Sequence, residues 1–314
     1  MKKVAIVGSM NVDYSVCVAH TPAVGETILA DRLSITPGGK GANQAFAVGR
    51  LGGDAVMLGA VGEDSYGGLL LDSLKGADVD VAYVKKTAER STGMALIAVN
   101  NDGDNTIIVV PGTNSLVDKA YIDDMRSVIE RCDILVMQLE IPMETVLHTA
   151  KLAKSLGKTV ILDPAPASLE IDEALFRYVD IATPNETELA MLTGESTASE
   201  NLSRAAAALK ARGVKNVIAT LGDKGAFLST ADGFEKLYPP TPGIHAVDTT
   251  AAGDSFTASV AISLASGLEL PDAIQSAMAV AEIVITRKGA QASIPSKEEL
   301  RNRGMLLNEG VVSP

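Results

Sequence analysis

The feature that most constrains the fold is a regular alternation of short apolar runs with amphipathic stretches. The apolar runs end in polar or Gly/Pro-rich turns and occupy residues 4–9, 133–140, 159–166, 180–188 and 216–225. The stretches between them, such as 143–157 and 202–213, have helical spacing. Strand–helix alternation over this length predicts a mainly parallel sheet with helices on both faces, which is a three-layer α/β/α fold.

Two segments interrupt this alternation. Residues 14–36 and 91–111 read as strands with no crossover helix between them, and Gly103 supplies a hairpin turn in the second segment. We expect a small antiparallel β-sheet outside the main one, acting as a lid that covers a site or pairs with a second copy of the chain. The sequence contains no interdomain linker or repeat, so residues 1–314 are expected to form a single domain.

Charge and composition argue against several classes of protein. The chain has a formal net charge of −12, so neither nucleic acid nor an anionic membrane is an expected partner. No run of about 18 apolar residues occurs, so no transmembrane span is predicted. Cys17 and Cys132 lie far apart without metal-ligand spacing, which favours reduced thiols in a cytoplasmic protein.

Polar residues close most of the predicted strands. In open α/β sheets, ligands bind beyond the carboxyl ends of the strands, so these residues are candidates for a site. They are Asn11, Asp13, Glu140, Asp163, Asn185, Glu188, Thr220, Gly222 and Asp248.

The stretch DTTAAGDSF (248–256) places two aspartates around small residues at the start of a helix. Residues 245–248 read as a strand end, and a helical pattern begins at Ala252. The small residues leave backbone N–H groups bare at the positive end of the helix dipole. This predicts an anion hole for a transferring phosphoryl group, with Asp254 as a base that accepts a proton from an attacking hydroxyl. The alternatives are a helix-start residue at Asp254 and a turn or cap residue at Asp248.

A second glycine cluster, PGGKGANQA (37–45), also opens a predicted helix. It matches neither the phosphate-binding loop of nucleoside triphosphatases nor a dinucleotide fingerprint. Its glycines would let a small polyhydroxyl ligand approach the backbone, while Lys40 and Asn43 donate hydrogen bonds to it. The alternative is an ordinary Gly-rich turn before a helix.

These motifs resemble the ribokinase/phosphofructokinase-B family of carbohydrate kinases, and its ribokinase branch in particular. GGKGANQA near the start and DTTAAGDSF near the end are similar to that family's two signatures. Between them, the expected order is followed by QLE (138–140), DPAPA (163–167), PNETE (184–188), TLGDKGA (220–226) and TRKGAQASIP (286–295). The resemblance covers about residues 3–300 and implies a ribokinase-like fold.

The resemblance implies transfer of the γ-phosphoryl group of ATP to the 5-hydroxyl of D-ribose. Asp254 would be the base, and the anion hole would be formed by the amides of Ala251, Ala252, Gly253 and Asp254. Alternative acceptors are 2-deoxyribose, another pentose or a nucleoside. The alternative of another class is a regulator that binds sugar or nucleotide without turnover. A homodimer formed through the lid is the expected assembly.

The resemblance also implies binding roles for residues elsewhere in the chain. The sugar hydroxyls would be held by Asn11, Asp13, Gly39, Lys40, Asn43 and Glu140. Magnesium and phosphate would be ordered, largely through water, by Asn185 and Glu188. The nucleotide would contact Thr220, Gly222, Gly225, Gly253 and Met278. A potassium ion would be enclosed by Asp248, Thr250, Val284, Arg287, Gly289 and Ser293.

Simpler interpretations of the sugar residues stay open. Asn11 and Asp13 could form a turn after the first strand. Glu140 could be a surface charge at a strand end, and Lys40 could be a solvated charge. Each interpretation leaves the side chain outside any ligand site.

The same holds for the nucleotide and metal residues. Asn185 and Glu188 fit a helix cap because they are three residues apart at a helix start. Residues 220–225 fit a plain turn between strands. Met278 stands where relatives often have a polar residue beside adenine, so an apolar base contact is expected there. Glu282 has no assigned role in its otherwise apolar helix.

Overall fold

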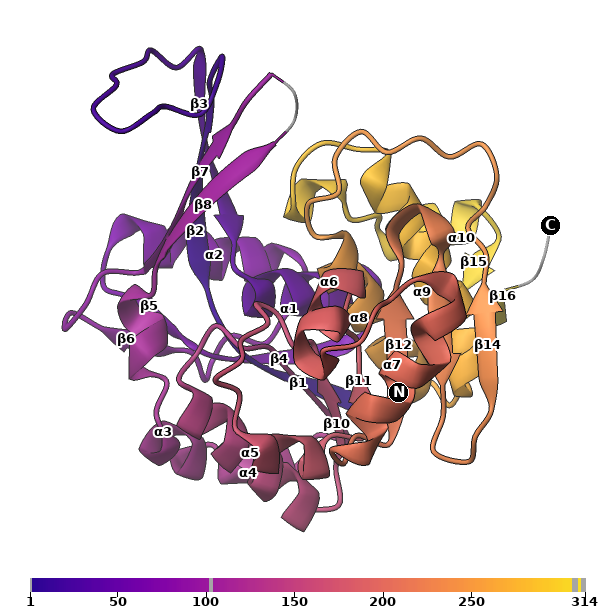
Figure 1. The fold of residues 1–314 in the computed structure, drawn as a ribbon. Coiled ribbons are helices and arrows are strands. Elements are labelled where there is room, and N and C mark those ends of the chain that lie inside the picture. The colour runs from indigo at the N-terminus through magenta and orange to yellow at the C-terminus, as the bar shows by residue number, and fades with distance from the viewer. Residues whose placement is uncertain (1, 102–103, 307–309, 312–314) are drawn as a thin grey trace.

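The computed structural model describes residues 2–101, 104–306 and 310–311, and it is built on one eight-stranded sheet (Figure 1). The strand order is β14-β13-β12-β11-β10-β9-β1-β4. The run from β12 to β4 is parallel, whereas β13 and β14 add an antiparallel edge. The bounds are β1 Lys3–Val7, β4 Asp54–Leu58, β9 Ile134–Met137, β10 Thr159–Leu162, β11 Ile181–Ala182, β12 Asn216–Thr220, β13 Ala226–Ser229 and β14 Glu235–Tyr238.

Helices cover both faces of this sheet because alternate residues of each buried strand point to opposite sides. In β1, Ile6 joins a core with Val260, while Val7 joins a second core with Val146. The first face carries α1 Lys40–Arg50, α2 Ser65–Gly76, α8 Ala252–Ala265, α9 Leu270–Ile285 and α10 Lys297–Asn302. The second carries α3 Lys119–Asp124, α4 Arg126–Glu130, α5 Met143–Ser155, α6 Glu186–Thr193 and α7 Leu202–Ala211. The predicted three-layer fold is confirmed.

The predicted small sheet is also present, and in Figure 1 it projects beyond the helical layers from a base beside α1 and α2. Its order is β3-β2-β7-β8, with bounds β2 Asn11–Cys17, β3 Arg32–Gly38, β7 Gly93–Val99 and β8 Asn105–Val110. Both hairpins are antiparallel, but they meet along β2 and β7, which pair in parallel. The sheet is therefore mixed at its centre. The hairpin turn expected at Gly103 lies outside the described residues.

Two pairs of short strands lie outside these sheets, and short 3-10 helices occupy Gly112–Leu116, Glu173–Tyr178, Ser199–Asn201, Gly222–Lys224 and Gln291–Ser293. β5 (Ala60–Gly62) pairs in parallel with β6 (Lys85–Thr87), and β15 (Met305–Leu306) pairs with β16 (Gly310–Val311). In the described parts of the chain, no helix combines the length and the hydropathy that a membrane crossing requires.

The strand end predicted at 245–248 is wrong, because β14 ends at Tyr238 and the chain then runs without helix or strand to α8. The amides of Val247 and Asp248 both donate to the carbonyl of Ile285, at 2.7 and 3.2 Å. This segment is therefore held by the end of α9 and not by a strand ladder. That placement brings the start of α8 beside the loop that follows α9.

Candidate active site

The candidate site lies at the carboxyl ends of β1, β9 and β10, where the amino ends of α1 and α8 meet. Gly39 makes the start of α1 possible, since its φ is 87° and a Cβ there would lie 2.6 Å from the backbone nitrogen of Asn11. A side chain at this position would push the helix away from β2. The backbone of the glycine cluster therefore lies directly against the base of the small sheet.

Glu140 and Ser9 cap the amino end of α1. The Glu140 carboxylate accepts from the Lys40 amide at 3.2 Å and from the Ser9 hydroxyl at 2.5 Å. The Ser9 hydroxyl oxygen also accepts from the Gly41 amide at 3.3 Å. Glu140 is thus a positioned carboxylate inside the site and not a free surface charge. Ser9 was not predicted.

Asp254 occupies the first turn of α8 and is only 6% exposed. Its two carboxylate oxygens accept from different side chains of α1, from Asn43 Nδ2 at 3.0 Å and from Gln44 Nε2 at 3.1 Å. Asp254 therefore points into the site and not toward solvent. The neighbouring Gly253 is exposed, and a Cβ added there would meet no atom within 4 Å. The turn beside this acid is consequently open.

The backbone before α8 is turned by Ala251, whose φ of 60° lies in the left-handed region that L-residues seldom adopt. Ala252 donates its amide to the carbonyl of Thr249 at 3.1 Å. Within the hydrogen bonds described, the amides of Ala251, Gly253 and Asp254 have no acceptor. Of the amides predicted for the anion hole, that of Ala252 is thus already in use.

Carboxyl groups gather around Lys40, which is partly buried. Burial opposes its charge, but Asp254, Asp163, Glu140 and Glu188 raise the pKa of Lys40. Burial, and then the charges of Glu140 and Asp254, raise the pKa of Asp13 to about 7. Burial also raises the pKa of Asp163 well above its ordinary value, against the effect of Lys40. The charged residues predicted to hold the sugar, Asp13, Lys40 and Glu140, therefore lie close enough to interact electrostatically with Asp254.

Asn11 belongs to β2 and is not a turn residue after the first strand. It is 2% exposed, and its Oδ1 accepts from Nδ2 of Asn114 at 2.7 Å. Asn114 in turn accepts from the amide of Met10 at 2.9 Å. No local pattern marks Asn114, because its partners lie more than a hundred residues away in the chain.

Asn185 and Glu188 form the capping box of α6. Asn185 Oδ1 accepts from the Glu188 amide and Glu188 Oε2 accepts from the Asn185 amide, both at 2.8 Å. The helix-cap interpretation therefore describes their hydrogen bonds. The charge of Glu188 nevertheless acts on both Lys40 and Asp163, so this residue also faces the carboxyl cluster.

Thr220, Gly222 and Gly225 lie where β12 turns back into β13. Strand packing accounts for Gly225, since a Cβ there would lie 1.9 Å from the carbonyl oxygen of Tyr238. Thr220 forms a parallel bridge with Asn185. The turn thus runs beside the start of α6, and the structure explains Gly225 without a nucleotide.

The residues predicted to enclose a monovalent cation come together from two segments. Asp248 accepts from the amide of Gly289 at 2.8 Å and from the amide of Thr250 at 2.9 Å. Although burial opposes its ionisation, these hydrogen bonds and that of the Thr250 hydroxyl lower the pKa of Asp248. Ser293 is fully buried and donates to the carbonyl of Ala290. Asp248 therefore joins the loop before α8 to the loop after α9.

Met278 and Glu282 lie one turn apart on α9. Met278 is partly buried against the core. Glu282 accepts from the amide of Thr241 at 2.7 Å, which explains a carboxylate in this apolar helix. It ties the loop between β14 and α8 to α9.

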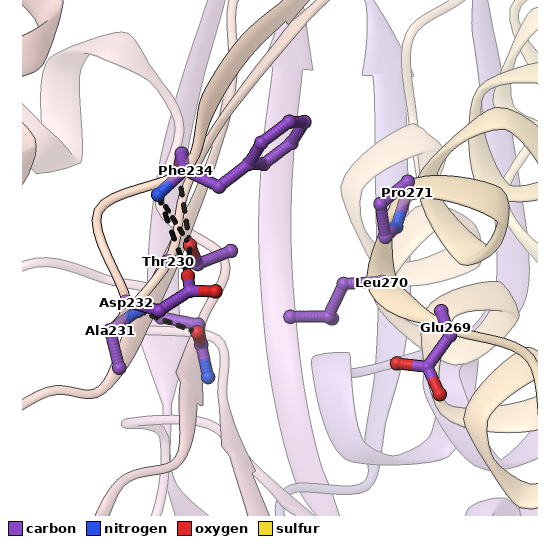
Figure 2. Close-up of a pocket in the computed structure, with 8 residues that line it drawn as sticks. Thr230, Ala231, Asp232, Phe234, Glu269, Leu270 and Pro271 are labelled. Atoms are coloured by element: carbon purple, nitrogen blue, oxygen red, sulfur yellow. Dashed lines mark hydrogen bonds between the residues drawn. The ribbon is translucent and has the colours of Figure 1, made fainter.

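A pocket of about 480 Å³ lies elsewhere, between the turn after β13 and the start of α9 (Figure 2). Figure 2 shows Phe234 and Leu270 pointing toward one another across it. Asn216, which begins β12, lines this pocket, whereas Thr220 at the other end of β12 borders the candidate site. The pocket is therefore at the opposite end of that strand from the residues described above.

Comparisons with known proteins agree with this arrangement. Residues 1–297 match the model of the pfkB family carbohydrate kinases. The chain is 40% identical over 310 residues to a ribokinase of Schizosaccharomyces pombe, covering 96% of this chain and 97% of that protein. It is 36% identical over 307 residues to a deoxyribokinase of Salmonella typhi, with 98% and 99% covered.

A solved structure of Arabidopsis thaliana ribokinase complexed with ribose and ATP is similar throughout. It superposes with a TM-score of 0.88 at 34% identity, covering 98% of both chains. The chain therefore belongs to the pfkB family of carbohydrate kinases and is a sugar kinase, a phosphotransferase with an alcohol group as acceptor.

We predict that Glu282 orders the loop between β14 and α8. Replacing Glu282 with Ala removes the acceptor of the Thr241 amide, so hydrogen exchange at residues 241–247 should become about fivefold faster. Glu282→Gln keeps a carbonyl oxygen as acceptor and should exchange like the wild type. Unchanged exchange in the Ala variant would contradict this role.

Proposed function

We propose that this kinase transfers the γ-phosphoryl group of ATP to the 5-hydroxyl of D-ribose, giving ribose 5-phosphate and ADP. The observation that carries the proposal is Asp254, a buried acid beside the open amino end of α8. A carboxylate within reach of the hydroxyl accepts its proton. The amides of Ala251, Gly253 and Asp254 then stabilise the negative charge on the phosphoryl group.

The acceptor sugar would lie against the group of Asn11, Asp13, Gly39, Lys40, Asn43 and Glu140. Supporting this, Asp13, Glu140 and Asp254 interact electrostatically, and Asn43 contacts Asp254 directly. Carboxylates that accept, with an ammonium and an amide that donate, suit the vicinal hydroxyls of a pentose. Gly39 would let the sugar approach the backbone.

ATP would lie along the turn at Thr220, Gly222 and Gly225 and reach α9 near Met278. Magnesium would be held near Asn185 and Glu188, largely through water, because a carboxylate oxygen of Glu188 stays outside the capping box. When bound, it would neutralise charge on the phosphates.

A potassium ion would be held by Asp248, Thr250, Val284, Arg287, Gly289 and Ser293. The carbonyl and carboxylate oxygens of these segments suit a hard cation, and Asp248 already joins the two loops. When bound, it would add positive charge beside the anion hole. Asp248 itself orients the amide of Thr250 in the turn before α8.

A second acceptor, 2-deoxyribose, is supported by the similarity to a deoxyribokinase, which matches about as well as the ribokinases do. A regulator without turnover is disfavoured because binding alone does not require a buried acid at an anion hole. Two free thiols, Cys17 and Cys132, together with the use of ATP, favour the cytoplasm as the compartment.

The base role is tested with Asp254→Asn. We expect phosphate transfer from ATP to D-ribose, in magnesium and potassium, to fall about 10³-fold, while ribose affinity changes less than about tenfold. Phosphorus NMR of the product identifies the 5-phosphate. Asp272→Asn is the matched control, since Asp272 is an exposed acid in the first turn of α9, and it should retain wild-type turnover.

A wild-type protein that leaves ribose unchanged while it phosphorylates 2-deoxyribose would transfer the assignment to that sugar. If it phosphorylates no sugar or nucleoside, the kinase proposal fails. Equal loss of turnover and affinity in Asp254→Asn would indicate a structural role for this residue.

The pKa of Asp13 predicts a pH dependence for sugar use. Burial and neighbouring carboxylates raise this pKa to about 7, so the ionised form that accepts sugar hydroxyls is present above pH 7 and lost below it. We expect kcat/KM for ribose to fall toward tenfold per pH unit on acidification below about pH 7. In Asp13→Asn, kcat/KM should be low and this dependence absent; an inflection that persists in that variant would refute the assignment.

The assembly is proposed to be a homodimer. Its interface is the small sheet, which also serves as the lid of the site. All residues of the edge strand β8 are exposed, and Ile107 and Ile108 are 51% and 61% exposed. Exposed apolar edge strands favour pairing with another chain. A second copy presents the same self-complementary surface.

We predict a dimer by sedimentation at micromolar concentration. Ile108→Lys should shift it toward monomer by placing charges in the interface, whereas Leu237→Lys on the edge strand β14 should not. A wild-type monomer under these conditions would contradict the proposal.

A further inference from the structure

Gln44 joins two buried carboxyl groups at the candidate site. It lies on α1 with no exposed surface, and its Nε2 donates to Asp163 Oδ2 at 2.8 Å and to Asp254 Oδ1 at 3.1 Å. A side-chain amide has two N–H groups, so both are used by these two acids. The single amide of Gln44 thus bridges the proposed base and a second carboxyl group.

Gln138 fixes the orientation of this amide. Its Nε2 donates to Oε1 of Gln44 at 2.5 Å, which leaves Gln44 fully hydrogen-bonded. The reversed orientation would place the carbonyl oxygen of Gln44 against two carboxylate oxygens, which is unfavourable. Among the described residues, the carbonyl oxygen of Gln138 itself has no partner. The described hydrogen bond of the buried Gln138 amide is therefore the one that it donates to Gln44.

Asp163 anchors the far side of the bridge. It closes β10, is 6% exposed, and within the described hydrogen bonds its side chain accepts from Gln44. Neither Gln44 nor Asp163 has a role in the sugar and phosphate contacts proposed above. Gln44 therefore connects Asp254 to a second buried carboxyl group.

The other oxygen of Asp254 is bound by Asn43, which precedes Gln44 on α1. Asn43 donates to it and accepts from Nε2 of Gln291 at 3.2 Å. Both oxygens of Asp254 thus accept hydrogen bonds from consecutive residues of α1, which together set the plane of its carboxylate. Loss of the Gln44 branch would leave rotation about the last side-chain bond unrestrained on one side.

We propose that Gln44, oriented by Gln138 and anchored by Asp163, is a positioning residue that holds the carboxylate of Asp254 in the plane required for proton transfer. The inference rests on the proposed function, in which Asp254 is the base. Gln44 acts through Asp254 and not on the sugar. Its contribution therefore belongs to kcat and not to the KM for ribose.

The direct test is Gln44→Met, which keeps the side-chain length and removes the hydrogen bonds. We expect kcat to fall about 10- to 100-fold, with the KM for ribose within about threefold of the wild type. In an Asp254→Asn background the same change should alter the residual rate by less than about threefold, because the carboxylate it positions is already gone.

A second variant guards against loss of folding, since Gln44→Met removes the described donor to the Asp163 side chain and leaves Asp254 with that of Asn43. Gln138→Met removes the donor to Gln44 together with a carbonyl that has no partner among the described residues, so it should lower the thermal midpoint less than Gln44→Met does. It frees Gln44 to rotate, and kcat should fall about threefold to tenfold. The matched control is Ser263→Ala, which removes a buried hydroxyl of α8 that lies outside the bridge and has no partner in the described parts of the chain, and it should leave kcat unchanged.

The outcomes separate this inference from the proposed function. Wild-type kcat in both Gln44→Met and Gln138→Met, with Asp254→Asn inactive, would overturn the positioning role alone. An equal loss from Gln44→Met in the wild-type and Asp254→Asn backgrounds would also overturn it, because a structural effect is additive. Full activity of Asp254→Asn would instead remove the proposed base.

Discussion

The site depends on one contact, in which the first turn of α8 meets the first turns of α1. Asp254 receives hydrogen bonds from Asn43 and Gln44, so two helix amino ends are held together by an acid of one and amides of the other. Both helix dipoles point their positive ends at this place, which favours negative charge there. The open turn at Gly253 and the buried acid beside it follow from that junction.

Charge balance shapes the rest of the site. Several carboxyl groups lie near each other, with Lys40 as the cation on which they act. Burial raises the pKa of Asp13 and Asp163, so these two acids are the ones most easily neutralised. In the proposed function, the carboxyl groups of Asp13 and Glu140 offer acceptors to the sugar hydroxyl groups, and the amides before α8 offer donors to the phosphate.

Side-chain carboxylates accept hydrogen bonds from backbone amides in the loop before α8 and in the loop after α9. Glu282 accepts from Thr241, and Asp248 accepts from Gly289 and Thr250. The segment between β14 and α8 is held by these contacts and not by pairing with a strand. The loop therefore lies close to the end of α9.

Sequence alone determined the layered α/β fold, the small sheet and the helix that begins at Ala252, because periodicity and glycine placement act over a few residues. It also predicted Asp254 and Asn43 as site residues through local motifs, and Asp13 through its place after the first predicted strand. Only the tertiary structure decided that β2 and β7 pair in parallel, and that Gln44 bridges Asp163 and Asp254. Such partners lie up to 210 residues apart, and no local pattern encodes which distant groups packing brings together.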